Sequence, residues 1–232
     1  MRIALVLTGF MRNWKENIDS IFSNIIFPYN PDVYISSYTY SKLYWNSESI
    51  PIDHEEVIKI YNPKNYIFRD KETCPEFNFK ENRRECIGRN YSIRQLCEWH
   101  TNYLILKLFN FDEYDVIIKL RTDISIKNFS IIHNYSLVIP DWKYHPGPCS
   151  PKESYVDYIA YGDSKHMKGY LNLYSKMQEM HDKNIADISL GETLLKEYLN
   201  YYVTKEVFLD KNVDWNLRGE MWASERAKIF PL

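Results

Sequence analysis

The sequence lacks both glycine-rich motifs that most often mark a phosphate-binding turn. Neither GxGxxG nor GxxxxGK[ST] occurs in the 232 residues, which excludes the usual Rossmann dinucleotide site and the P-loop. A charge excess is lacking as well, because the formal net charge is -2. Nothing therefore favours nucleic acid as the main partner. No stretch approaches the roughly 18 apolar residues of a membrane-spanning helix, so we expect no transmembrane segment.

Cysteine is scarce and shows no ligand pattern. The four cysteines form no CxxC pair and have no histidine at zinc-ligand spacing. Scattered cysteines of this kind fit buried or free thiols in a reducing compartment. The short apolar run at the N-terminus continues into TGFMRNW instead of a small-residue cleavage site. We therefore expect a cytoplasmic protein.

Short apolar runs and helical stripes alternate along the chain. The runs predict strands at Ile3–Leu7, Asp32–Tyr38, Asn65–Arg69, Tyr114–Leu120, Ser136–Pro140, Tyr155–Gly162 and Tyr202–Leu209. Helical spacing predicts helices at 14–26, 53–61, 91–109 and 190–202, and a further helical stripe made of Met167, Tyr170, Leu171, Tyr174 and Met177. The stripe favours packing on the sheet over a cofactor box. The alternation predicts one α/β domain over residues 1–232, with a mainly parallel central sheet flanked by helices.

Helix boundaries carry local signals. Asn13 stands where it would cap the first helix, and Pro28 and Pro31 would stop that helix. Asp53 and Glu56 have the spacing of a capping box for the second helix.

The stretch YDVIIKLRTDISI ends its apolar run with Arg121 and Asp123. In open α/β sheets, ligands bind beyond the carboxyl ends of the strands. A carboxylate at that place suits magnesium or manganese, and a guanidinium suits a phosphate oxygen. A simple surface ion pair is the other interpretation that this pattern allows.

A second candidate element follows the first strand. Thr8-Gly9 predicts a tight strand-to-helix turn, with Arg12 at the start of the next helix. Glycine lets backbone amides approach a ligand, and a helix N-terminus favours anions. A purely structural turn is the alternative.

The order of these elements resembles a family of viral and bacterial glycosyltransferase-like proteins. The resemblance is carried by IALVLTGFMRNW, NPDVYISSY, YSIRQL, YDVIIKLRTDISI, DYIAYGDSKHMKGYLNLY and ETLLKEYL, over roughly residues 2–202. Similar proteins of large DNA viruses and of bacterial surface-polysaccharide clusters are nucleotide-sugar-dependent transferases of the GT-A fold. The resemblance thus implies a GT-A-like domain that transfers a sugar to a glycan or other hydroxyl acceptor. A viral member would act in the host cytoplasm.

The resemblance also assigns roles to the residues singled out above. Arg121-Thr122-Asp123 stands where GT-A enzymes carry Asp-x-Asp, and only the last aspartate matches. Asp123 would hold Mn²⁺ or Mg²⁺ against the donor diphosphate. Arg121 would either supplement that cation or mark a weakened metal dependence. The nucleotide side of the cleft would be lined by Thr8, Gly9 and Arg12.

A catalytic base is less well defined. An inverting transferase needs a carboxylate that takes the acceptor's proton. Glu192 opens the helix in GETLL, where the family often places this base, and Asp157 and Asp187 are rivals. Their other interpretations are a helix N-terminal charge for Glu192, a strand-edge residue for Asp157 and a helix cap for Asp187.

Two other functions fit parts of the pattern. A non-catalytic nucleotide-sugar or carbohydrate-binding module would tolerate the missing first aspartate. A nucleotidyltransferase would catalyse pyrophosphate exchange, but its usual glycine-rich basic loop is missing. Residues 203–232 would either close over the donor site or pack on the domain. The donor, the acceptor, the stereochemical course and the oligomeric state are not set by these patterns.

Overall fold

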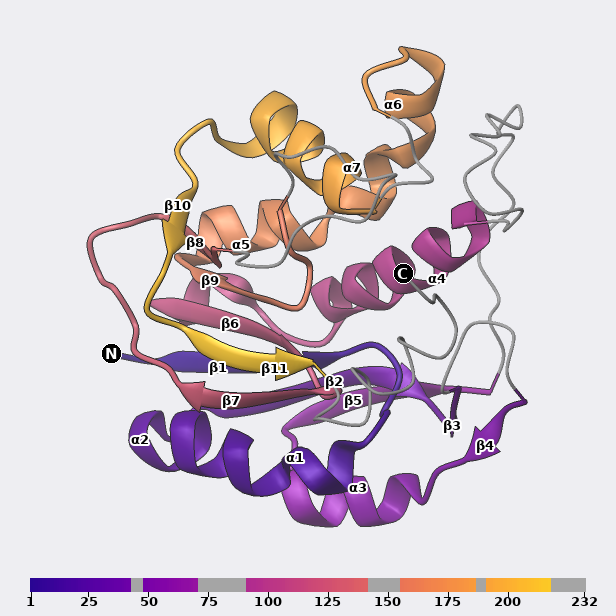
Figure 1. Cartoon of the computed structure of the whole chain (residues 1–232), viewed down its shortest axis with the longest axis vertical. Helices are drawn as coiled ribbons and strands as arrows, with labels where there is room; N and C mark the ends of the chain where they lie inside the picture. Colours follow the sequence, from indigo (N-terminus) through magenta and orange to yellow (C-terminus); the bar gives the residue numbers. More distant parts are fainter. Residues whose placement is uncertain (43–47, 71–90, 142–154, 187–190, 218–232) are drawn as a thin grey trace, which may run out of the picture.

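A computed structural model describes residues 1–42, 48–70, 91–141, 155–186 and 191–217. Strands and helices alternate along the chain, and helices lie on both faces of a central sheet (Figure 1). The sequence prediction of an α/β fold with a mostly parallel sheet flanked by helices is therefore confirmed.

Within the described residues, the central sheet has seven strands in the order β10-β8-β9-β6-β1-β2-β5. In chain order, these strands are β1 (Ile3–Thr8), β2 (Asp32–Tyr38), β5 (Asn65–Arg69), β6 (Val116–Arg121), β8 (Leu137–Pro140), β9 (Ile159–Gly162) and β10 (Phe208–Asp210). β6, β1, β2 and β5 run parallel to one another, and β10 runs parallel to β8. β9 is antiparallel to both of its neighbours. The carboxyl ends of β6, β1, β2 and β5 therefore meet at one edge of the sheet.

The two central strands, β1 and β6, are buried along their whole length. Near-continuous apolar runs such as IALVL are typical of parallel strands that are covered on both faces. Lys119 and Arg121 are the charged exceptions in β6. Because side chains alternate along a strand, these two residues lie on the same face of the sheet.

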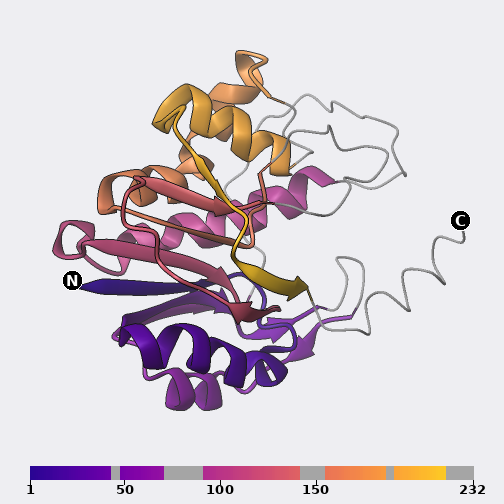
Figure 2. The same ribbon diagram turned by 60° about the vertical axis from the view of Figure 1, so that its left-hand side comes forward.

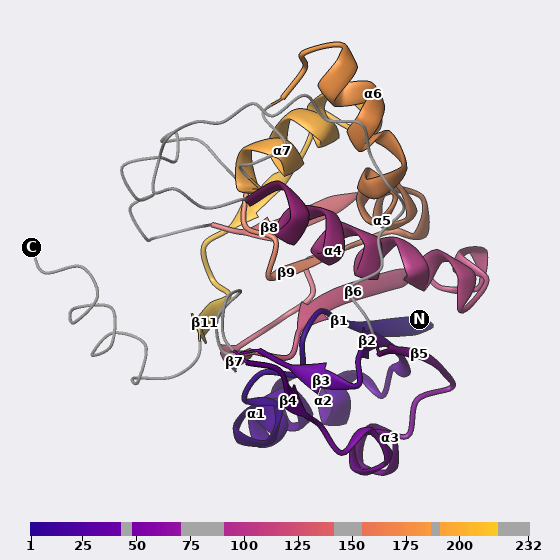
Figure 3. The ribbon, with the colours of Figure 1, turned by 90° about the vertical axis from the view of Figure 1, so that its right-hand side faces the viewer.

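Each face of the sheet has its own set of helices. α1 (Trp14–Ile21), α2 (Phe27–Tyr29) and α3 (His54–Tyr61) lie on one side (Figure 1), and the set on the other side is α4 (Tyr91–Leu104), α5 (Ser164–Leu171), α6 (Met177–Asp182) and α7 (Gly191–Tyr198). Figure 2 and Figure 3 show the same three layers from other directions. None of the helices in the described ranges is both long and apolar enough to cross a bilayer.

Two small antiparallel sheets were not predicted. β3 (Tyr40–Ser41) pairs with β4 (Ile50–Pro51), and β7 (Ile124–Asn128) pairs with β11 (Asp214–Leu217). β7 begins directly after Asp123, and its partner comes from the far end of the chain. A strand whose partner is so distant in sequence carries little local signal, which explains why it was missed.

Helix ends follow the predictions in part. Asp53 caps α3, because its side chain accepts a hydrogen bond from the Glu56 amide at 2.9 Å. Asn13 precedes α1 in a left-handed conformation, with φ of 47°, and makes no side-chain cap. The prediction that Pro28 stops the helix was wrong. A π-helical turn at Phe22–Ile26 leads directly into α2, so the helical run passes through Pro28 and ends at Tyr29, shortly before Pro31.

The last predicted strand was misplaced. Leu199–Val203 forms a π-helical turn that extends α7, and the strand that follows is β10. Tyr202 packs on Tyr198 with 5.5 Å between ring centroids, and Val203 lies against Gly169 of α5. This packing overrides the β-propensity of the tyrosines. β9 is also shorter than predicted, since it begins at Ile159.

The predicted stripe does pack in the core. It runs through α5, a 3-10 turn at Leu173–Lys176 and the start of α6. Its members are all buried in the same hydrophobic cluster as β1 and β6: Met167, Tyr170, Leu171, Tyr174 and Met177.

Candidate ligand-binding site

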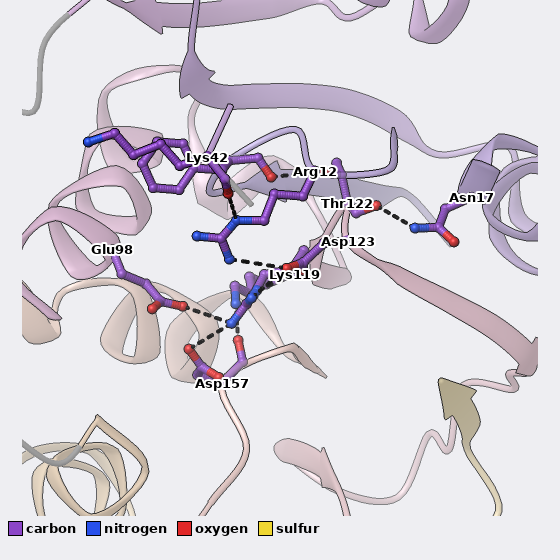
Figure 4. A network of polar contacts seen from close by, with 10 residues as sticks. Arg12, Asn17, Lys42, Glu98, Lys119, Thr122, Asp123 and Asp157 are labelled. Atoms are coloured by element: carbon purple, nitrogen blue, oxygen red, sulfur yellow. Dashed lines mark hydrogen bonds and ion pairs between the residues drawn. The ribbon is translucent and has the colours of Figure 1, made fainter. Parts of the chain in front are cut away.

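The candidate site lies beyond the carboxyl ends of β1 and β6, which are neighbouring parallel strands. Their register pairs Thr8 with Arg121, so the residues that follow the two strands come together at the same edge. Six charged side chains gather there, which we call the buried charge cluster: Arg12, Glu98, Lys119, Arg121, Asp123 and Asp157 (Figure 4).

Arg121 and Asp123 form a bidentate pair at the centre of this cluster. Arg121 Nε donates to Asp123 Oδ1 at 3.0 Å, and Arg121 Nη2 donates to Asp123 Oδ2 at 2.7 Å. Their side chains are only 7% and 2% exposed. Two parallel N–H···O bonds of this kind are strong and fix both planes. The ion pair that the sequence allowed therefore exists, but it is buried and not on the surface.

Arg121 is also held from the side of α4 and β9. Its Nη1 lies 3.3 Å from Glu98 Oε1 and 3.5 Å from Asp157 Oδ2, and its guanidinium stacks over the Tyr158 ring at 4.4 Å. Burial by itself lowers the pKa of Arg121. The carboxylates around it outweigh burial and raise that pKa well above the usual value.

Arg12 reaches the cluster from the turn after β1. Its Nη1 lies 3.5 Å from Asp123 Oδ2, and its Nε donates to the Lys42 carbonyl at 2.5 Å. The guanidinium also covers the Phe10 ring at 5.0 Å, and Phe10 stacks on Tyr38 with 4.6 Å between centroids. Arg12 is therefore fixed from three sides between Lys42 and Asp123 (Figure 4).

Lys119 is a member of the site that sequence reasoning missed. It is fully buried, and its Nζ donates to the backbone carbonyl of Asp157. Burial lowers the pKa of Lys119 to about 8, and the neighbouring carboxylates of Asp157 and Glu98 offset part of the effect. The signal was present: a single lysine interrupts an apolar strand, on the same face as Arg121.

Glu98 was also missed. It comes from α4, which lies over the same face of the sheet, and its side chain is 15% exposed. In the sequence it is an ordinary glutamate within a helix. Only the packing of α4 on β6 brings it to Arg121.

Thr8 and Gly9 form the turn that carries Arg12. Gly9 has φ of +90°, and a Cβ there would meet only Arg121 Cγ, at an ordinary 3.9 Å. The backbone conformation, rather than space, therefore requires glycine. The Gly9 carbonyl accepts a bond from the Ser37 hydroxyl at 2.7 Å. The Thr8 hydroxyl is buried and has no hydrogen-bond partner among the described residues.

The structure describes the three candidate bases to different extents. Asp157 is 6% exposed and belongs to the buried charge cluster. Glu192 is the second residue of α7, and its side chain lies outside what the structure describes. Asp187 lies outside the described residues altogether. Of residues 203–232, the described part reaches 217, and β11 brings it beside β7, directly after Asp123.

An open hollow adjoins this edge of the sheet. Its volume is ≈ 240 Å³, and it opens on the residues that begin α1 together with the β3–β4 hairpin. The lining residues are Met11, Arg12, Asn13, Trp14, Lys15, Glu16, Ser41, Ile50 and Ile52. Arg12 thus belongs both to the buried charge cluster and to the wall of this hollow.

The surroundings of Asp123 do not fit a divalent cation. Both carboxylate oxygens accept from Arg121, and Arg12 approaches one of them. Mg²⁺ and Mn²⁺ need several oxygen ligands with accessible lone pairs. Among the described residues, no three His, Cys, Asp or Glu side chains are grouped so that they could hold a metal ion. The cation on Asp123 therefore stays a prediction of the sequence resemblance.

Comparisons with known proteins add no relative. No protein-family model matches the chain. A search of curated proteins finds no match.

Proposed function

We propose that the protein is a glycosyltransferase that moves a sugar from a nucleoside-diphosphate sugar to a glycan or another hydroxyl acceptor. The observation that carries the proposal is the contact between Arg12 and Asp123 beside an open hollow. It joins the two elements that the sequence resemblance assigns to the donor. The mostly parallel sheet supports the proposal, because ligands of such sheets bind beyond the carboxyl ends of the strands.

The proposed chemistry is a displacement at the anomeric carbon of the sugar. The bond between the anomeric carbon and the phosphate oxygen breaks, and the nucleoside diphosphate leaves with the electron pair. The acceptor oxygen bonds to the anomeric carbon, and its proton passes to a carboxylate. Cationic groups beside the diphosphate stabilise the negative charge that grows on the leaving group. We assign this role to Arg12, and Glu192 and Asp157 remain the candidates for the base.

The test is a panel of UDP-, GDP- and TDP-sugars, with CMP-sugars, which carry a single phosphate, as the contrast. A true donor binds the folded state and raises the melting temperature, and it is slowly hydrolysed to free sugar. We expect the sugars of one nucleotide to give both the largest rise in melting temperature and the fastest hydrolysis. The absence of any shift and of any hydrolysis across the panel contradicts the proposal.

A matched pair of variants makes the test specific to the site. Arg12 follows β1, whereas Arg2 precedes it at the opposite edge of the sheet, where it pairs with Glu113. We expect Arg12→Gln to weaken donor binding by roughly tenfold or more, and Arg2→Gln to leave it unchanged. Equal effects of the two variants contradict a donor site at Arg12.

A non-catalytic binding module is the second candidate. It is favoured by the arginine at position 121, which takes up the carboxylate of Asp123. This candidate predicts a melting-temperature shift with a nucleotide sugar but no release of sugar, with any acceptor. Hydrolysis of the same donor that produces the shift rules it out.

A further inference from the structure

Asp123 lies between the guanidinium groups of Arg121 and Arg12, and Figure 4 shows its contact with Arg12. Arg121 donates hydrogen bonds to Oδ1 and Oδ2 of Asp123 at 3.0 and 2.7 Å. Arg12 Nη1 lies 3.5 Å from Oδ2. The residue is 1% exposed. A dication placed on this carboxylate would lie next to both arginines, and like charges a few ångströms apart repel strongly where solvent screening is weak. The local charge distribution therefore opposes a metal at this position.

The two arginines differ in what they face. Arg121 is turned inward, toward Glu98 and Asp157. Arg12 lines the open hollow, and its position is fixed by the Lys42 carbonyl and by Asp123. Asp123 thus links Arg121 to Arg12, which is one of the residues that line the hollow.

We propose that the protein binds the diphosphate of its ligand through Arg12 without a divalent cation, and that Asp123 is a positioning residue for Arg12. The inference rests on the proposed function, because it assumes that the ligand is a nucleoside diphosphate or its sugar. A planar guanidinium donates two parallel hydrogen bonds to phosphate oxygens. A guanidinium that is already fixed loses little conformational entropy when it does so.

The decisive measurement uses the wild-type protein. UDP, GDP, TDP and inorganic pyrophosphate are titrated calorimetrically in EDTA, and again with excess Mg²⁺ or Mn²⁺. We expect the dissociation constant of the best ligand to differ by less than about threefold between the two buffers. Binding that needs the cation, with a loss of roughly a hundredfold or more in EDTA, overturns the inference.

Two variants sharpen the result. Arg12→Gln should weaken diphosphate binding in EDTA by about tenfold or more, while the control Arg2→Gln leaves it unchanged. Asp123→Asn keeps an oxygen that accepts from arginine and removes a negative charge from the site. We therefore expect it to bind diphosphate in EDTA within about tenfold of the wild type. A metal ligand would instead lose cation-dependent binding on the same substitution.

The outcomes separate this inference from the proposed function. Binding only with the cation overturns the inference and leaves the glycosyltransferase proposal in place. Lack of binding to every probe in both buffers overturns both. Should Asp123→Asn fail to fold, as judged by circular dichroism, the EDTA comparison and Arg12→Gln still decide the matter.

Discussion

Two groups of ion pairs in this protein share their chemistry and differ in their surroundings. The buried charge cluster has its central pair, Arg121 and Asp123, at 7% and 2% side-chain exposure. At α6, the surface cluster of Lys176, Glu179 and Lys183 has contacts of 2.9 and 2.7 Å, with side chains 34–54% exposed. The distances in the two clusters are alike, and the solvent exposure differs sharply.

The difference bears on the proposed function. Exposed pairs contribute little to stability, because water and salt screen them. Buried pairs are costly to break, yet well-packed apolar residues in their place would be about as stable. Stability alone therefore does not explain six charged groups under α4, and the proposed ligand binding at the carboxyl edge of the sheet would supply a reason for them. The predictions below test this contrast, in order of expected effect.

Removal of the central arginine should have the largest effect. Arg121→Met leaves three carboxylates without their shared cation, so we expect a loss of about 3 to 5 kcal/mol in the free energy of unfolding. Urea denaturation measures this loss. Arg121→Lys keeps the charge without the forked geometry and should lose clearly less. A loss below about 1 kcal/mol for Arg121→Met, a value typical of exposed pairs, would show that the two clusters contribute alike to stability.

Lys119 should make stability depend on alkaline pH. The pKa of Lys119 is about 8 in the folded protein, against 10.5 for an ordinary lysine, so the unfolded chain binds more protons between these two pH values. Stability of the wild type should then rise with pH from about 8 to 10.5, by up to about 3 kcal/mol relative to Lys119→Met. Denaturation of both proteins across this window provides the measurement. Parallel pH curves for the two proteins would show that Lys119 is not desolvated.

Glu98 belongs to the buried charge cluster, but its side chain is 15% exposed, which is more than Arg121 or Asp123 and less than the surface cluster. Glu98→Gln removes a charge but keeps an oxygen near Arg121, so we expect a loss of about 1 to 2 kcal/mol. The same urea titration detects it. An effect as large as that of Arg121→Met would mean that the partial exposure of Glu98 provides no screening.

The surface cluster should show the smallest effect. Hydrogen bonds from Lys176 and Lys183 lower the pKa of Glu179 to about 2, yet the group is solvent-exposed. We expect Glu179→Gln to lower the unfolding midpoint only slightly at neutral pH and physiological salt. The wild type should lose its small advantage only as the pH falls from 4.5 toward 2, because protonation then removes the pairing. A marked destabilisation at neutral pH would contradict the view that burial decides the value of these pairs.

Local signals predicted the elements that they control directly. The apolar runs of β1, β2, β5 and β6 and the Asp53 cap were found because each depends on neighbours in the sequence. The local signals failed where contacts with distant segments determine the secondary structure. The pairing of β7 with β11 and the π-helical turn at Leu199–Val203 both depend on segments that are far away in the chain.

The same distinction between local signals and distant contacts applies to the candidate site. By itself, the sequence predicted Arg12, Arg121 and Asp123 at the carboxyl edge of a mainly parallel sheet, because Arg121 and Asp123 end one apolar run and Arg12 follows another. That β1 and β6 are neighbours comes from the tertiary structure. Only the tertiary structure decided that Asp123 is buried between two guanidinium groups and that Glu98 and Lys119 join them. The physical reason is that the direction of a side chain and its solvent exposure depend on what packs over the strand. Here α4 and the segment before β9 bring Glu98 and Asp157 to Arg121. Nothing in the local sequence of either segment predicts these contacts.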